Sequence, residues 1–215
     1  MSGDAGNDVL HGGKGDDVLD GGEGDDHVEG NSGDDMMIDS AGNDTYVGGA
    51  GFDTLDFSAA RSGMSIDVSK GTASGDGEKN TMKTIERVIG SSFADDYKGS
   101  KGDDVFEGGD GDDRIRGMGG SDTLTGGAGR DTFVWLAKDL GSGVDHITDF
   151  SKDDVLDLRG VLKGQVYGAL SDVVHVAASD KGTKVSVKIG DAMVDVVTLD
   201  GVNAPDLLAS GLILS

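Results

Sequence analysis

Residues 12–30 read GGKGDDVLDGGEGDDHVEG, and the organisation of the whole chain follows from this stretch. Glycine loses the most conformational freedom on folding and adjacent aspartates repel each other, so such a composition is typical of a disordered acidic linker. Val18, Leu19 and Val28 nevertheless recur at an even spacing. Two interpretations are open at this point: a flexible linker, or a folded segment completed by something absent from the sequence.

A nine-residue repeat without slips decides between these interpretations. The units run from Gly3 to Asp56 and from Gly90 to Val134, eleven in all. Position 4 is glycine in ten units, with Phe93 as the exception, and position 6 is aspartate in every unit. Position 8 is always large and apolar: Leu10, Leu19, Val28, Met37, Tyr46, Leu55, Tyr97, Phe106, Ile115, Leu124 and Phe133. A low-complexity linker would not keep this register, so the pattern predicts a repetitive fold.

Each position of the unit has a physical reason. The first six, glycine-rich positions suit a tight turn with positive φ. The last three favour a strand in which position 8 points one way and positions 7 and 9 the other. Two units then form one coil of a parallel solenoid with the position 8 side chains stacked inside. Stacked turns bring carboxylates and carbonyls into columns, and a hard divalent cation with six or more oxygen ligands, best met by Ca²⁺, satisfies both.

The units match GGxGxDxUx and so resemble the RTX, or hemolysin-type calcium-binding, nonapeptide, which also occurs in adhesins, serralysin-like proteases and alginate epimerase modules. The resemblance implies an all-β, right-handed parallel β-roll, with each Ca²⁺ between a turn and the turn two units further on. It implies these carboxylate ligands: Asp8, Asp17, Asp26, Asp35, Asp44, Asp53, Asp95, Asp104, Asp113, Asp122 and Asp131. It also implies carbonyl ligands at positions 2 and 4: Gly6, Gly13, Gly15, Gly22, Gly24, Gly33, Gly42, Gly49, Gly51, Gly102, Gly109, Gly111, Gly120, Gly127 and Gly129. The two arrays then hold about seven calcium ions.

Two units depart from the pattern in their turns. In unit 90–98 Phe93 replaces the glycine of position 4, and unit 39–47 begins with Asp39 and Ser40 instead of two glycines. We expect the calcium sites that involve these two turns to be weaker or missing.

The chain is expected to divide into four segments. These are a first array (1–56), a β insertion that continues the solenoid (57–89), a second array (90–134) and a β-rich C-terminal cap (135–215). In the insertion, 64–69 and 84–89 alternate like half-buried strands, whereas 71–81 has the composition of a polar loop.

Beyond Trp135 the glycine-aspartate repeat disappears. Strands are predicted at 144–150, 155–158, 173–177, 184–189 and 193–199, with a two-residue hairpin turn at Gly190 and Asp191 and a helix from Asn203 to Gly211. This segment resembles the C-terminal target domain of type I secreted bacterial proteins, which implies an uncleaved export signal that includes 212–215. Four aspartates here are compatible with either a further calcium site or a solvated acidic loop: Asp149, Asp153, Asp154 and Asp157.

Composition excludes several classes of partner. A formal net charge of −23 argues against nucleic acids and anionic membrane surfaces. Cysteine is absent, so neither disulfides nor thiolate metal sites contribute. The first four residues lack the basic and apolar regions of a signal peptide, and no stretch approaches the roughly 18 apolar residues of a membrane-spanning helix.

Catalytic motifs are missing from the sequence. Neither H-E-x-x-H nor G-x-S-x-G occurs, and His11 and His27 fall on outward positions 9 and 7. We therefore expect no enzyme activity within these residues. The alternative function is a calcium-stabilised polysaccharide-binding module of a secreted carbohydrate-active enzyme or adhesin, for which Lys98, Arg114 and Arg116 form the one basic patch.

These observations predict a calcium-binding module that folds on extracellular Ca²⁺ and carries the C-terminal signal for type I secretion. The expected partners are calcium and, during export, the secretion machinery, and the expected location is the exterior or surface of a Gram-negative bacterium. Gly3 already occupies position 1 of a unit, so we expect this segment to belong to a larger protein.

Overall fold

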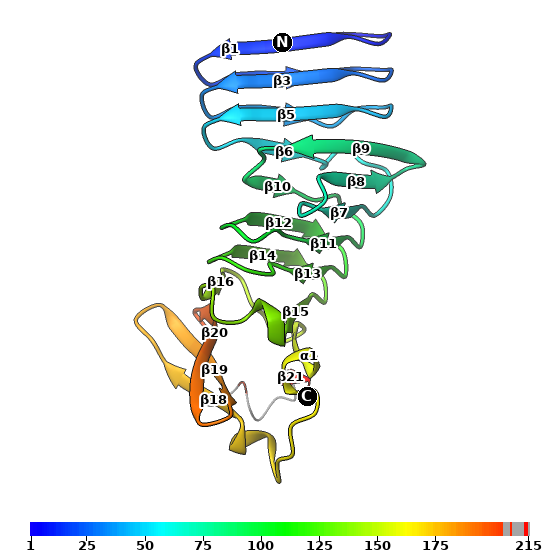
Figure 1. Ribbon diagram of the computed structural model, residues 1–215. Helices are drawn as coiled ribbons and strands as arrows, with labels where there is room; N and C mark the ends of the chain where they lie inside the picture. Colours follow the sequence, from blue (N-terminus) through cyan, green and yellow to red (C-terminus); the bar gives the residue numbers. More distant parts are fainter. Residues whose placement is uncertain (204–206, 208–212, 215) are drawn as a thin grey trace.

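The described part of the chain is almost entirely β-structure. The computed structural model describes residues 1–203, Leu207 and residues 213–214. Strands stack along one direction from the N-terminus, and the antiparallel strands β18 to β20 lie at the opposite end (Figure 1). The described strands form one sheet of eleven and one of ten, in which the repeat strands pair in parallel. The expected all-β parallel β-roll is therefore confirmed.

Two nonapeptides form each coil of the first array. Its strands are β1 (Val9–Lys14), β2 (Val18–Asp20), β3 (His27–Ser32), β4 (Met36–Ile38), β5 (Thr45–Ala50) and β6 (Thr54–Asp56). The odd-numbered strands pair in one sheet and the even-numbered strands in the other. Leu10 lies opposite Val28, and Leu19 lies opposite Met37, so each coil advances by two repeat units.

The second array repeats this arrangement. Its strands are β11 (Asp96–Lys98), β12 (Val105–Asp110), β13 (Arg114–Arg116), β14 (Thr123–Ala128) and β15 (Thr132–Leu136). In both arrays every position 8 side chain points inward and is at most 4% exposed. The rings of Tyr97 and Phe106 stack with centroids 4.0 Å apart. Burial of such side chains contributes roughly 1.5–3 kcal/mol each, so this internal column is the core of the roll.

The insertion differs from its prediction in one respect. It contains β7 (Ser65–Asp67), β8 (Thr72–Gly75), β9 (Glu78–Lys83) and β10 (Arg87–Ile89). The segment 71–81, predicted as a loop, instead contributes β8 and most of β9, which pair antiparallel. Its polar side chains suit a strand that is half exposed, and pairing to β7 and β5 satisfies its backbone.

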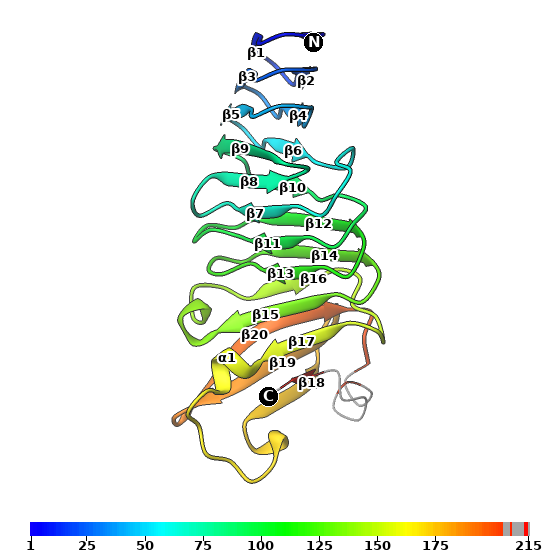
Figure 2. The same ribbon diagram turned by 90° about the vertical axis from the view of Figure 1, so that its right-hand side faces the viewer.

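The two sheets cross the insertion differently. One sheet runs from β6 through β10 to β12 in parallel register. The other sheet accommodates three strands in the order β9, β8, β7 between β5 and β11 (Figure 2). The solenoid therefore continues through residues 57–89, with a hairpin added to one of its sheets.

The C-terminal segment extends both sheets. Its described residues form two short 3-10 helices (Ala137–Asp139 and Leu170–Asp172), α1 (Arg159–Leu162), β16 (Asp145–Ile147), β17 (Val155–Leu158), β18 (Val174–Ala178), β19 (Gly182–Ile189), β20 (Ala192–Asp200) and β21 (Ile213–Leu214). β16 joins β14 to β20, and β17 joins β15 to β21.

The predicted hairpin at Gly190 and Asp191 is confirmed, because Ile189 pairs with Ala192 across it. The helix predicted from Asn203 to Gly211 falls mostly outside the described residues, as do the ends of the 212–215 segment. Among the described residues no helix has the length and apolarity needed to cross a membrane.

Candidate metal-binding turns

The position 6 aspartates form a ladder along each column of turns. The backbone N–H of Asp8 donates to Asp26 Oδ1 at 2.8 Å, and Asp26 donates in the same way to Asp44. The same bond recurs from Asp17, Asp35, Asp95, Asp104 and Asp113 to the aspartate two units on, at 2.8–3.0 Å. One oxygen of each receiving carboxylate is therefore committed to the backbone of the preceding turn.

The second carboxylate oxygen has no partner in most units. Eight Oδ2 atoms are buried without a hydrogen-bond partner among the described residues: those of Asp8, Asp17, Asp26, Asp35, Asp53, Asp113, Asp122 and Asp131. Asp53, Asp122 and Asp131 are completely buried. A buried carboxylate oxygen without a donor is costly, so these turns require a positive charge or a proton.

The same burial raises the pKa of several of these carboxyl groups. Desolvation raises the pKa of Asp113 to about 7, of Asp122 to about 8 and of Asp131 to about 6. Neighbouring carboxylates in the column, such as Asp95 beside Asp113, add to the effect. Each group is therefore poised to exchange a proton for a cation near neutral pH.

Glycine at position 1 leaves room for the free oxygen. A Cβ on Gly21 would lie 2.2 Å from Asp26 Oδ2, and one on Gly126 would lie 2.2 Å from Asp131 Oδ2. Position 2 borders a carbonyl instead, since a Cβ on Gly22 would lie 1.9 Å from the carbonyl oxygen of Asp4. Carboxylate and carbonyl oxygens of successive turns thus share the same narrow columns.

The donor set of these columns consists of oxygen atoms. Among the described residues no group of three or more His, Cys, Asp or Glu side chains could hold a metal ion. Each turn instead offers one carboxylate together with backbone carbonyls. Oxygen ligands in this number suit Ca²⁺, whereas Zn²⁺ requires nitrogen or sulfur ligands.

Three of the eleven units differ. In these units the Oδ2 atom already accepts a hydrogen bond: Asp44 from the Tyr46 hydroxyl, Asp95 from the Ser91 N–H and Asp104 from the Ser100 N–H. Among the glycines predicted as carbonyl ligands, Gly102 lacks the positive φ found at the other fourteen. The turns singled out in the sequence, 39–44 and 90–95, are two of these three.

The ladder extends to four residues outside the two arrays, of which the sequence analysis singles out only Asp154, as part of the C-terminal acidic group. Asp44 N–H donates to Asn80 Oδ1, and Asp53 N–H donates to Glu86 Oε2, both at 2.9 Å. At the other end Asp122 and Asp131 donate to Asp145 and Asp154. Turn length changes at all four positions, which hid them from a nine-residue alignment. Their common signal is an oxygen-bearing side chain two residues before a buried apolar one: Met82, Val88, Ile147 and Leu156.

The C-terminal acidic group separates into different roles. Asp154 joins the ladder, and Asp149 accepts hydrogen bonds from the N–H groups of Gly126 and Gly127. Asp153 pairs with Lys152, and Asp157 pairs with Arg159. The structure therefore does not gather the four aspartates around one point.

A second ladder runs through position 5. The N–H of Asp34 donates to Asp16 Oδ1, and that of Phe52 donates to Asp34 Oδ1, each at 2.8 Å. The N–H of Arg130 donates likewise to Asp112. The side chains of Phe52 and Arg130 offer no acceptor for a further bond of this kind. Position 5 is also occupied by Ala94 and Ser121, so this ladder is less regular than that of position 6.

The basic patch on the outer face of the second array is largely neutralised. Lys98 binds Asp67, with Nζ to Oδ distances of 2.8 and 2.9 Å. Arg116 forms two hydrogen bonds to the carboxylate of Asp139. On the first coils, His11 and His27 both contact the Glu29 carboxylate and lie on the outer face as predicted.

Similarity to solved structures is low. The extracellular lipase LipA from Serratia marcescens aligns with 94% of this chain at 20% identity and a TM-score of 0.36, and the chain spans 38% of that lipase. The AlgE6R3 subunit of the Azotobacter vinelandii mannuronan C5-epimerase aligns with 57% of this chain and 78% of its own length, at 26% identity and a TM-score of 0.24. Both scores lie below 0.5, so the fold is argued from the strand pairing above.

The repeat region itself matches a known family. No curated protein sequence matches the chain. The sequence pattern of the RTX calcium-binding nonapeptide repeat, taken four copies at a time, matches residues 2–37, 20–55, 89–124 and 98–133. The matched parts cover both arrays and leave out the insertion hairpin. They coincide with the two stretches in which position 6 aspartates accept the N–H of the turn two units before. Residues 2–55 and 89–133 of this chain are therefore RTX calcium-binding repeats.

Proposed function

We propose that this chain is the calcium-driven folding module of a secreted protein and that it carries a C-terminal signal for type I export. The observation that supports the calcium part best is the set of eight buried Oδ2 atoms for which the described residues supply no donor. Calcium bound between successive turns would satisfy them together with the carbonyls of positions 2 and 4. We assign the position 6 aspartates as its side-chain ligands.

Calcium would act through the free energy of folding. The stacked turns do not exist in an unfolded chain, so binding stabilises the folded state alone. At a calcium concentration ten times the dissociation constant, each site adds about 1.4 kcal/mol. About seven ions would also reduce the net charge from −23 to about −9, which removes much of the repulsion in the compact state.

Secretion follows from the same dependence. Extracellular calcium modules bind with dissociation constants of about 10⁻⁴–10⁻³ M, far above the free calcium of a cytosol. We propose that the chain stays unfolded inside the cell, passes an export channel in that state and folds outside a Gram-negative bacterium. The resemblance of 135–215 to type I target domains supports the signal at its C-terminal end.

A calcium titration followed by far-UV circular dichroism tests the folding part. We expect little β-structure in EGTA, a cooperative gain of β-structure at submillimolar to millimolar calcium, and no comparable gain with magnesium. Trp135 is a second probe, because it is 2% exposed and its Nε1 donates to Asp145 Oδ2 at 2.6 Å. A chain already fully β-structured in EGTA would rule out the proposal.

Export is tested separately. The chain is expressed in a bacterium with a type I secretion system, with and without residues 212–215, and the culture medium is assayed. We expect the complete chain in the medium and the truncated chain inside the cells. Equal export of both would remove the signal from the proposal and leave the calcium part intact.

The polysaccharide-binding alternative has weaker support. Lys98 and Arg116, two of its three basic residues, are bound to Asp67 and Asp139. An array of acidic and neutral glycans probed in calcium distinguishes the two functions, since the folding module is expected to bind none of them.

A further inference from the structure

We infer that serine at position 2 takes the place of calcium within its turn, so that the turns of Ser91 and Ser100 form a calcium-independent segment between two calcium-dependent parts of the roll. This inference rests on the proposed calcium function and assigns which turns of this chain take part in it.

Residue type, backbone conformation and carboxylate partner vary together at position 2. In eight units this residue has a positive φ: Asp4, Gly13, Gly22, Asn31, Gly49, Gly109, Met118 and Gly127. The same eight units contain the eight buried Oδ2 atoms that have no hydrogen-bond partner in the described part of the chain. The remaining three units have serine at position 2, namely Ser40, Ser91 and Ser100, and none of these serines has a positive φ. In these three units the Oδ2 atom is satisfied.

The turn of Ser91 satisfies its aspartate completely. The Ser91 N–H donates to Asp95 Oδ2 at 2.7 Å, and its hydroxyl donates to Asp95 Oδ1 at 2.8 Å. The hydroxyl also accepts the N–H of Phe93 at 3.1 Å. The N–H of Met64, from the insertion, supplies a further donor to Asp95 Oδ1 at 2.7 Å. Asp95 is 3% exposed, yet each of its oxygens has at least one donor.

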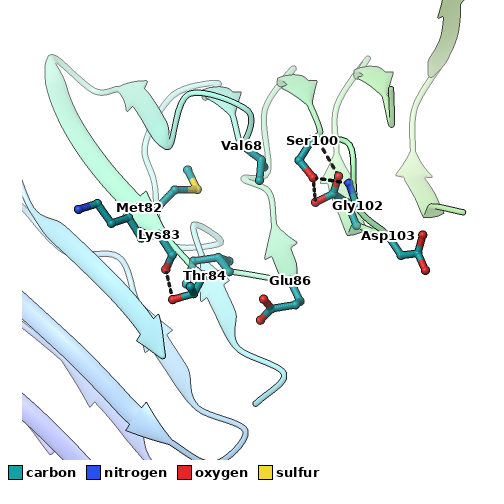
Figure 3. Close-up of a pocket in the computed structure, with 10 residues that line it drawn as sticks. Val68, Met82, Lys83, Thr84, Glu86, Ser100, Gly102 and Asp103 are labelled. Atoms are coloured by element: carbon teal, nitrogen blue, oxygen red, sulfur yellow. Dashed lines mark hydrogen bonds between the residues drawn. The ribbon is translucent and has the colours of Figure 1, made fainter. Parts of the chain in front are cut away.

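The turn of Ser100 repeats this arrangement one unit later. Ser100 N–H donates to Asp104 Oδ2 at 2.6 Å, its hydroxyl contacts Asp104 Oδ1 at 3.3 Å, and Gly102 N–H donates to the hydroxyl at 3.0 Å. Figure 3 shows the Ser100 side chain within this turn, beside a cavity of about 250 Å³ that also borders Glu86. Gly102 is the one position 4 glycine without a positive φ, so the backbone of the whole turn differs.

These contacts remove the need for a cation. A carboxylate that accepts several N–H and O–H bonds is stabilised by neutral donors, whereas the free Oδ2 atoms elsewhere are not. The third serine unit reaches the same end differently, because Tyr46 donates its hydroxyl to Asp44 Oδ2 at 3.0 Å. Ser91 and Ser100 belong to consecutive units, whose turns lie on opposite flanks of the roll. The two columns of turns therefore each have one serine turn directly after the insertion.

The first experiment converts both turns to glycine turns. The S91G/S100G variant and each single variant are compared with the unchanged chain by equilibrium dialysis against ⁴⁵Ca²⁺. Glycine permits a positive φ at position 2 and removes the hydroxyl. We expect about one additional bound ion for each converted turn, because each would complete one site with the turn two units on. Ser32→Gly, at exposed position 3 of its unit, is the matched control and is expected to leave the number unchanged.

The second experiment runs in the opposite direction and guards against a variant that fails to fold. Asn31 occupies position 2 with φ 78°, and Asp35 in the same turn has a free Oδ2. We expect Asn31→Ser to lower the number of bound ions by one or two and Asn31→Ala to leave it unchanged.

The outcomes separate this inference from the proposed function. An unchanged ion number in S91G/S100G and in Asn31→Ser overturns the inference while the calcium function stands. The inference is supported if S91G/S100G folds and binds more calcium ions than the unchanged chain, or if Asn31→Ser folds and binds fewer while Asn31→Ala does not. A wild-type chain that binds no calcium overturns the proposed function itself.

Discussion

At the scale of a residue, the position 6 aspartate serves two purposes with its two oxygens. Oδ1 accepts the N–H of the preceding turn, as in the 2.8 Å bond from Asp17 to Asp35, and Oδ2 remains free. An amide could accept the first bond but could not supply a negative charge. Where the ladder meets the insertion, Asn80 takes the position and its amide donates to Asp39 at 2.7 Å. We therefore expect aspartate to be required where a cation is to be bound, whereas asparagine suffices for the backbone bond alone, as at Asn80.

The residue-scale prediction compares two adjacent aspartates. Asp35→Asn keeps one oxygen as the acceptor for the Asp17 N–H and replaces the free, charged oxygen with a neutral amide NH2 group. We expect at least a tenfold loss of calcium affinity in the adjoining sites, equivalent to about 1.4 kcal/mol per site. Asp34→Asn is the control, since exposed Asp34 only accepts the N–H of Phe52. Isothermal titration calorimetry measures both, and equal losses in the two variants would contradict the assignment.

At the scale of an element, β10 connects the two arrays across the insertion, because it pairs in parallel with β6 of the first array and β12 of the second. Val88 of β10 lies opposite Leu55 of β6 and Phe106 of β12, and it is 1% exposed. The internal column of apolar side chains therefore continues on this side. On the other side, the hairpin strands β8 and β9 complete the sheet with antiparallel pairs. One strand couples the cores of the two arrays.

The element-scale prediction follows from this coupling. Val88→Ala leaves a cavity in the internal column and is expected to lower the free energy of unfolding in saturating calcium by about 2 kcal/mol. The neighbouring Ile89→Ala alters an outward, partly exposed side chain and is expected to cost less than half as much. Urea unfolding followed by circular dichroism measures both. Similar losses for the two variants would show that β10 does not carry the core across the insertion.

At the scale of the whole molecule, the balance between charge and burial controls stability. Burial raises the pKa of Asp131, Asp113 and Asp122 to about 6, 7 and 8, against 3.8 in an unfolded chain. The calcium-free folded state therefore binds more protons than the unfolded state between about pH 4 and pH 8. Its stability falls as the pH rises through this range, because these carboxylates ionise inside the roll.

The corresponding prediction concerns the chain without metal. In buffer freed of calcium by a chelating resin, we expect more β-structure at pH 5 than at pH 8, with stability falling most steeply below about pH 6, where all three carboxyls are protonated only in the folded state. With calcium present, we expect affinity to increase over the same range because binding displaces the protons. Far-UV circular dichroism at several pH values checks the first part, and calorimetry in two buffers of different ionisation enthalpy checks the second. Identical calcium-free spectra at pH 5 and pH 8 would contradict it.

Much of the fold could be predicted from the sequence because the deciding contacts recur at one period. Residues at equivalent positions of the repeat, such as position 6 (Asp17) and position 8 (Leu19), have equivalent neighbours in each coil. The local nine-residue pattern therefore predicts which residues of successive coils lie opposite each other. The strands after Trp135 and the turn at Gly190 could be located for a similar reason, since alternation and turn residues are local signals.

The sequence by itself determined the coil of two nonapeptides, the internal column of position 8 side chains and the columns of carboxylates. Only the tertiary structure decided that 71–81 pairs as a hairpin, because a polar strand forms only where a sheet edge is available to it. It also decided that Asn80, Glu86, Asp145 and Asp154 continue the ladder, since turns of altered length bring them into register in space but not in sequence. The division between serine and glycine turns was decided in the same way, because the donors that satisfy Asp95 and Asp104 come from a backbone conformation that the repeat pattern does not specify.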